Sequence, residues 1–212
     1  MKKGESVRLW ALNHNRFTYI MALQLVKAGD RINLSKEQAG LKKLKIGLSW
    51  DVKEGVTADL DASVLILDQN EKMLTEDSIV FYNKLEAYGG AIKHSGDERS
   101  GAAEGDDETI AIDLSLLPDE VQIISAVITI YGTGENSLVT FGRVKNASVR
   151  LYNADTNQAL YQFDLSEDAS RGTAVEMARI YRKDGEWRFT TTGDIVGTSP
   201  NGLEDIISKY KR

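Results

Sequence analysis

Apolar and polar residues alternate over short stretches along most of the chain, and this period of two is typical of half-buried β-strands. The stretch 62–67 differs because it is almost continuously apolar, which predicts a strand buried on both faces near the centre of a sheet. Asp68-Gln69-Asn70 ends that stretch with residues that favour turns. Together these patterns predict strands at 23–26, 31–34, 44–50, 62–67, 79–82, 109–113, 121–131, 141–152, 159–163, 175–182 and 187–192.

The last part of the chain carries two local signals. Lys183-Asp184-Gly185-Glu186 separates two predicted strands, and Asp-Gly supplies the positive φ angles of a tight β-hairpin. Residues 202–210 instead place apolar side chains at helical spacing, which predicts a short C-terminal helix with one apolar face. Short strands bounded by turn residues, with 18 glycines against two prolines, are typical of all-β sandwiches and barrels.

The first twenty residues show neither sustained alternation nor a strong helix cap. We therefore expect residues 1–20 to be a loosely attached extension. Nothing resembling a linker divides the remainder, so residues 21–212 are predicted to form a single domain.

Composition narrows the function classes. The chain has 42% hydrophobic and 27% charged residues and lacks an apolar run near the ~20 residues that span a bilayer, so we expect a soluble protein without a transmembrane segment. It has no cysteine, which excludes disulfides, thiolate zinc sites and cysteine nucleophiles and favours a cytoplasmic location. A net charge of -6 disfavours nucleic acid as a partner and makes cations the more plausible ligands.

The segment 96–108 concentrates six carboxylates, at positions 97, 98, 104, 106, 107 and 108, against the single cation Arg99. Such crowding raises the free energy of the folded loop unless a positive charge neutralises it. The glycines of this segment let the backbone turn sharply, so that side chains and carbonyls can converge on one point. A flexible, oxygen-lined loop suits Ca²⁺ better than Mg²⁺.

A second acidic element, Asp59-Leu60-Asp61, leads into the apolar strand. Residues two apart on a strand face the same side, so the two carboxylates are expected to point together. Asp51 and Asn83 follow two other predicted strands and could supply further oxygens. Acidic surface loops are usually only solvated, but two separate carboxylate elements favour a metal site. Their spacing is not that of an EF-hand.

Other sites are weaker. Only His14 and His94 are available as bases, and His94 is best interpreted as structural, beside the acidic loop. Acid and base pairs of carboxylates leave a metal-dependent phosphohydrolase open as an alternative. Gly132-Thr133-Gly134-Glu135 is interpreted as a hairpin turn, because a nucleotide loop needs a third glycine within a βαβ unit.

Several sequence blocks, in this order, resemble the TerD family of tellurium-resistance and stress-response proteins across roughly residues 21–193. The blocks are Gly47-Leu48-Ser49-Trp50-Asp51, Asp59-Leu60-Asp61-Ala62-Ser63, Phe81-Tyr82-Asn83, His94-Ser95-Gly96-Asp97, Gly105-Asp106-Asp107-Glu108, Phe141-Gly142, Asp164-Leu165-Ser166-Glu167-Asp168 and Tyr181-Arg182 with Gly185-Glu186-Trp187.

The resemblance implies a two-sheet β-sandwich that binds one or two Ca²⁺ ions and is not an enzyme. Thr57 stands where family members often carry a further aspartate, which leaves the number of ions open. The first-choice ligands are Asp59, Asp61, Asp97, Asp106 and Asp107, with Asn83, Glu104, Glu108 and the carbonyl oxygen of Arg99 as possible additions. A second possibility is an interaction scaffold, in which Ca²⁺ is structural and other proteins of a stress complex are the partners.

Overall fold

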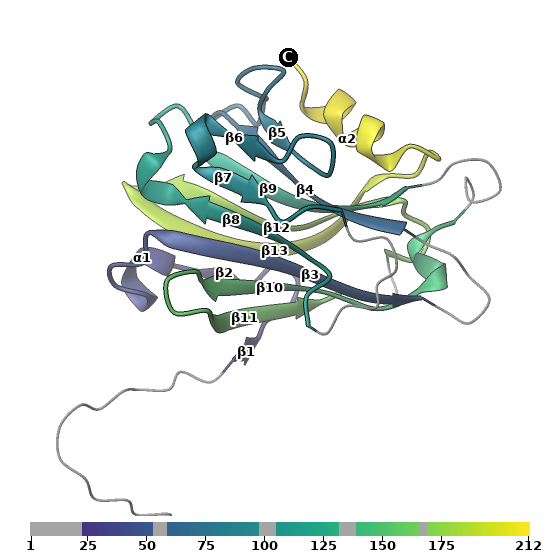
Figure 1. Cartoon of the computed structure of the whole chain (residues 1–212), viewed down its shortest axis with the longest axis horizontal. Coiled ribbons are helices and arrows are strands. Elements are labelled where there is room, and N and C mark those ends of the chain that lie inside the picture. Colours follow the sequence, from purple (N-terminus) through teal and green to yellow (C-terminus); the bar gives the residue numbers. More distant parts are fainter. Residues whose placement is uncertain (1–22, 53–58, 98–104, 132–138, 166–168) are drawn as a thin grey trace, which may run out of the picture.

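A computed structural model describes residues 23–52, 59–97, 105–131, 139–165 and 169–212. Within these residues the strands form two sheets that face each other (Figure 1), which confirms the predicted β-sandwich. The predicted extension 1–20 and the loop residues Arg99 and Glu104 lie outside the described residues.

The first sheet, sheet A, has the strand order β1-β11-β10-β3-β8-β7-β6. Neighbouring strands are antiparallel except β1, which pairs in parallel with β11. Its strands are β1 (Gln24–Leu25), β3 (Lys43–Val52), β6 (Glu86–Ala87), β7 (Ile92–His94), β8 (Glu108–Asp113), β10 (Val144–Asn153) and β11 (Gln158–Asp164).

The second sheet, sheet B, has the order β2-β13-β12-β9-β4-β5, and all its neighbours are antiparallel. Its strands are β2 (Arg31–Ile32), β4 (Asp59–Leu67), β5 (Ile79–Val80), β9 (Ile123–Tyr131), β12 (Ala174–Lys183) and β13 (Glu186–Gly197). The β12–β13 turn is the predicted hairpin, because Asp184 and Gly185 both have positive φ angles, 55° and 76°.

The main core lies between the sheets. Alternate residues of β4 enter it, including Leu60, Val64 and Ile66, and they meet Leu48 and Trp50 of β3. The other face of β4 is buried as well, because the C-terminal helix α2 (Gly202–Tyr210) packs on the outer side of sheet B (Figure 1). The continuous apolar stretch predicted to be buried on both faces is therefore confirmed.

The helix α2 begins at a polar cap and is held by apolar contacts. The side chain of Asn201 accepts a hydrogen bond from the backbone N–H of Glu204, which satisfies one of the free amides of the first turn. Ile206 and Tyr210 then pack against Leu65 and Leu67 of β4. The predicted C-terminal helix is confirmed with its apolar face toward the sheet.

Several short elements differ from the sequence prediction, among them β6 and β7, which were not predicted. The strand expected at 31–34 stops at Ile32, because Asn33 accepts a hydrogen bond from the backbone N–H of Lys36 and caps the one-turn helix α1 (Leu34–Glu37). The strand expected to begin at Phe141 begins at Val144, after a 3₁₀ turn over Phe141–Arg143.

Candidate metal centre

Three carboxylates from separate elements converge at one side of the sandwich. Asp61 comes from β4 of sheet B, Asp97 follows β7 of sheet A, and Glu108 opens β8 of sheet A. One oxygen of each carboxylate lies within 4.8 Å of an oxygen of the other two. This arrangement is the candidate metal centre, and it spans both sheets.

The carboxylates meet because β4 is only partly covered along one edge. In the described residues, β5 pairs with β4 at Val64 and Leu65 and leaves the preceding edge to side chains of sheet A. The backbone N–H of Ala62 donates to Oε2 of Glu108 at 2.6 Å. Nε2 of His94 lies 3.0 Å from the carbonyl oxygen of the same Ala62. The side chains of sheet A thus close the sandwich at the residue next to Asp61.

Burial makes this concentration of negative charge costly. Asp61 is 3% exposed and Glu108 is fully buried, whereas Asp97 is exposed. Burial of a carboxylate is unfavourable unless an opposite charge or hydrogen bonds compensate, and neighbouring carboxylates repel each other. A divalent cation among the three oxygens would relieve both effects.

The pKa of the neighbouring Tyr82 is affected by the same negative charges. Burial raises the pKa of its hydroxyl, and the nearby charges of Asp61, Tyr131, Asp97 and Asp59 add to the effect, because an ionised phenol beside negative charges is disfavoured. Tyr82 is partly buried at the margin of the candidate centre, next in the sequence to Asn83, one of the predicted ligands.

The backbone turns that deliver the carboxylates begin at Ser95. Its N–H donates to the carbonyl oxygen of Thr109, and its hydroxyl accepts the N–H of Thr109, which ties the end of β7 to β8. Gly96 follows with a φ of 115°, a conformation that strongly favours glycine, and its N–H donates to Nδ1 of His94 at 3.0 Å. The chain therefore enters the acidic segment through a turn fixed to the His94 ring.

Asp106 and Asp107, two first-choice ligands from the sequence, lie elsewhere. Oδ1 of Asp106 is 2.7 Å from Nη1 of Arg150 on β10. Asp107 accepts the backbone N–H of Trp50 at 2.9 Å, and its own N–H donates to the carbonyl oxygen of Leu48. The group of three carboxylates includes neither residue.

The remaining predicted oxygen ligands in the described residues do not belong to the group of three carboxylates. Asp59 opens β4 opposite Tyr131, on the same face as Asp61, as predicted. Asn83 is exposed in the turn between Phe81 and Lys84. Asp51, noted as an additional oxygen donor, instead accepts a hydrogen bond from Nδ2 of Asn146 at 2.7 Å.

The side chain of Asp106 leaves no room for a Cβ atom at residue 47, so this position requires glycine. A Cβ atom at this residue would lie 2.1 Å from Oδ2 of Asp106. We expect Gly47→Ala to lower the free energy of unfolding by about 2 kcal/mol, because Asp106 must move away from Arg150. Urea denaturation measures the loss. In an Asp106→Ala background the same substitution should cost much less, and an equal cost in both backgrounds would contradict this explanation.

The fold and this group of carboxylates define a class of two-sheet β-sandwich proteins with an acidic site that spans both sheets at one side of the sandwich. The TerD domain family matches residues 21–210. The chain is 42% identical to general stress protein 16U of Bacillus subtilis (strain 168) over 193 residues, which cover 90% of this chain and 97% of that protein. It is 36% identical to tellurium resistance protein TerD of Serratia marcescens over 192 residues, 90% of this chain and 97% of that protein.

The chain therefore belongs to the TerD family. Among solved structures, it is similar to a homologue of telluride resistance protein (TerD) from Streptomyces coelicolor A3(2), with a TM-score of 0.65 and 21% identity. That similarity covers 82% of this chain and all of the other, and it supports the fold. Within the described residues, no helix combines the length and apolar character needed to cross a membrane.

Proposed function

We propose that this protein is a non-catalytic Ca²⁺-binding protein that acts in stress response and tellurium resistance. The observation that carries the proposal is the convergence of Asp61, Asp97 and Glu108 from both sheets on one point. The names of the relatives, which describe stress and tellurium resistance, support the cellular role.

The ligand chemistry favours calcium over softer metals. All three candidate ligands are carboxylates, and the chain has no cysteine. His94 is close, but its two ring nitrogens already face the N–H of Gly96 and the carbonyl oxygen of Ala62. An all-oxygen set that leaves room for water suits Ca²⁺, which takes about six to eight oxygen ligands in flexible geometry. Bound there, the ion would supply positive charge that holds the two sheets together at this side.

A binding role fits these residues better than catalysis. A base that acts in catalysis must face a substrate or a nucleophile. The imidazole of His94 is buried and hydrogen-bonded to the backbone on both sides. The names of the relatives cited above refer to resistance and stress, and none specifies a reaction.

The proposed setting is the cytoplasm, in association with other proteins of a stress complex. A sequence without cysteine does not depend on an oxidising compartment for its folding. The relatives that carry the name of stress or resistance proteins support the association with a stress response.

Isothermal titration of chelator-treated protein with Ca²⁺ tests the proposal. We expect heat of binding and a rise in melting temperature, because an ion that binds only the native state stabilises it. The gain is about 2.7 kcal/mol at a free concentration one hundred times the Kd. Mg²⁺ serves as the comparison cation. If millimolar Ca²⁺ produced no heat and no shift in melting temperature, calcium binding would be refuted.

A further inference from the structure

His94 contacts all three segments that carry the candidate ligands. Its side chain is fully buried. Nδ1 accepts the N–H of Gly96, the residue before Asp97, and Nε2 lies 3.0 Å from the carbonyl oxygen of Ala62, the residue after Asp61. The same Nε2 is 3.4 Å from Oε2 of Glu108.

These contacts define the tautomer of the ring. The backbone N–H of Gly96 can only donate, so Nδ1 must accept and carries no proton. In the neutral imidazole the proton is then on Nε2, which donates to the carbonyl oxygen of Ala62. The partial positive charge of this N–H also faces Oε2 of Glu108.

Ala62 links this ring to two of the ligands. Its carbonyl oxygen accepts from His94, and its N–H donates to Glu108. Both groups belong to the part of the β4 edge that β5 does not cover, so these side chains substitute for a neighbouring strand. The backbone next to Asp61 is therefore fixed relative to β7 and β8 through side chains alone.

We propose that His94 is the positioning residue of the cation site, which holds Asp61, Asp97 and Glu108 in place for the ion without ligating it. This inference rests on the proposed Ca²⁺ binding. A group of ligands fixed in advance binds more tightly, because less conformational freedom is lost when the ion enters. Hydrogen-bond partners that orient metal ligands typically change affinity by tenfold to a hundredfold when they are removed.

Three variants at this position separate the two ring contacts. His94→Leu fills the space and makes neither hydrogen bond. His94→Asn places an amide oxygen near the Nδ1 position and can keep the Gly96 contact, whereas His94→Gln reaches toward the Nε2 position and can keep the Ala62 contact. The exposed neighbour Lys93 provides the control variant Lys93→Gln on the same strand.

Calcium titration is the first measurement, and urea denaturation in excess chelator gives the stability of each metal-free variant. We expect His94→Leu to weaken Ca²⁺ binding by at least tenfold, the two amide variants to fall between it and the native chain, and Lys93→Gln to bind normally. Folded His94 variants that lose stability but keep the native affinity would overturn the proposal. If His94→Leu does not fold, the two amide variants decide the question by the same criterion.

The ¹⁵N chemical shifts of the imidazole provide a readout that packing alone does not predict. We expect a protonated Nε2 and an unprotonated, hydrogen-bonded Nδ1, with both assignments kept when Ca²⁺ is added. A change of tautomer or direct coordination on Ca²⁺ addition would show a ligand and overturn the positioning role. If the native chain binds no Ca²⁺, the proposed function fails and this inference with it. If the native chain binds Ca²⁺ and the His94 variants bind it with the same affinity, only the positioning role of His94 is refuted.

Discussion

Asp61→Asn is expected to lower the affinity for Ca²⁺ by about a hundredfold. The substitution keeps the shape of a side chain that is 3% exposed but removes one of the three charges that would face a bound ion. Interactions with an ion in a buried setting are strong, so the loss of one charge should cost a few kcal/mol of binding free energy, and about 1.4 kcal/mol corresponds to tenfold. Titration calorimetry on chelator-treated protein measures the change.

Asp106→Asn is the matched comparison, because the sequence makes Asp106 an equally good ligand. The structure pairs this carboxylate with Arg150 instead. We expect its substitution to leave the Ca²⁺ affinity within about threefold while it weakens a partly buried ion pair and so lowers stability. The opposite result, a large loss of affinity at Asp106 and a small one at Asp61, would place the ion near Asp106 rather than at the group of three carboxylates.

Glu176→Ala is expected to give the largest loss of stability, about 3 kcal/mol. Glu176 is 1% exposed on the outer face of sheet B. Its carboxylate accepts hydrogen bonds from Ser125, from Nε of Arg179 at 2.9 Å and from the hydroxyl of Tyr210 in α2. Alanine would leave these donors without an acceptor in a buried setting. Urea denaturation at neutral pH measures the loss.

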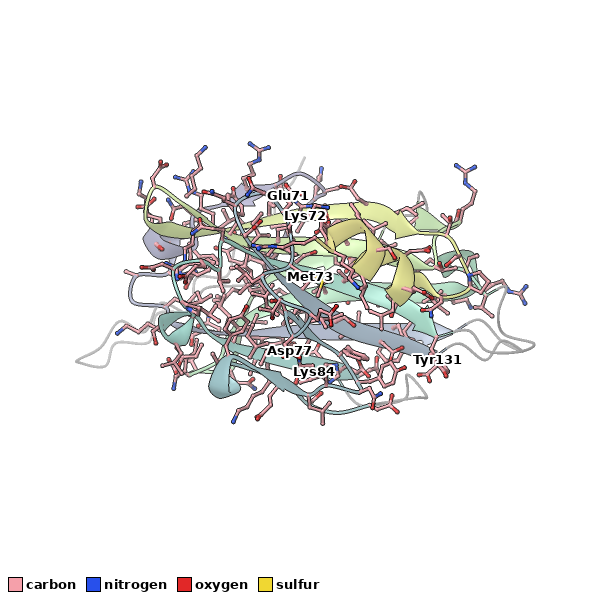
Figure 2. The ribbon with its side chains drawn as sticks, turned by 90° about the horizontal axis from the view of Figure 1, so that it is seen from above. Glu71, Lys72, Met73, Asp77, Lys84 and Tyr131 are labelled. Atoms are coloured by element: carbon pink, nitrogen blue, oxygen red, sulfur yellow. The ribbon has the colours of Figure 1, made fainter. Side chains whose placement is uncertain are left out.

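Glu71→Ala provides the control, because Glu71 pairs with the same guanidinium at 2.9 Å but its side chain is 49% exposed. An exposed ion pair contributes about 0–1 kcal/mol, so this variant should remain close to the native stability. The segment beside α2 contains Glu71, Lys72 and Met73 (Figure 2). The backbone N–H of Met73 donates to the carbonyl oxygen of Tyr210 in α2. Equal losses of stability in the two variants would show that burial does not make the contacts of Glu176 more stabilising than those of Glu71.

The fold could be predicted well where the pattern is local. Asp184-Gly185 determines its hairpin through positive φ angles, and α2 follows from helical spacing of apolar residues. The short strands β6 and β7 had no such signal, because two or three residues cannot establish a period. The one-turn helix α1 depends on a single cap at Asn33. Asn33 lies within the stretch 31–34 that was predicted as a strand, so the cap was not recognised.

The site could be predicted only in part for a similar reason. Alternation along a strand is local, so it correctly placed Asp59 and Asp61 on one face of β4. Which carboxylates then meet depends on contacts between distant segments. Asp106 is directed to Arg150, 44 residues away in the sequence, and Glu108 is directed to β4 of the other sheet. Asp106 precedes β8, whose pairing with β3 begins at Glu108, so the two carboxylates do not lie on one strand, and composition does not reveal where that strand begins.

The part of the β4 edge that β5 does not pair with, among the described residues, has a consequence for solubility. Open strand edges are templates on which another chain can add a strand, and this is a common route to aggregation. Here the carbonyl oxygen and N–H of Ala62 are occupied by His94 and Glu108, and the carboxylate of Asp61 lies beside them. The residues of the candidate metal centre thus also protect a vulnerable edge. Replacing these residues with small apolar ones should therefore favour self-association even in the absence of Ca²⁺.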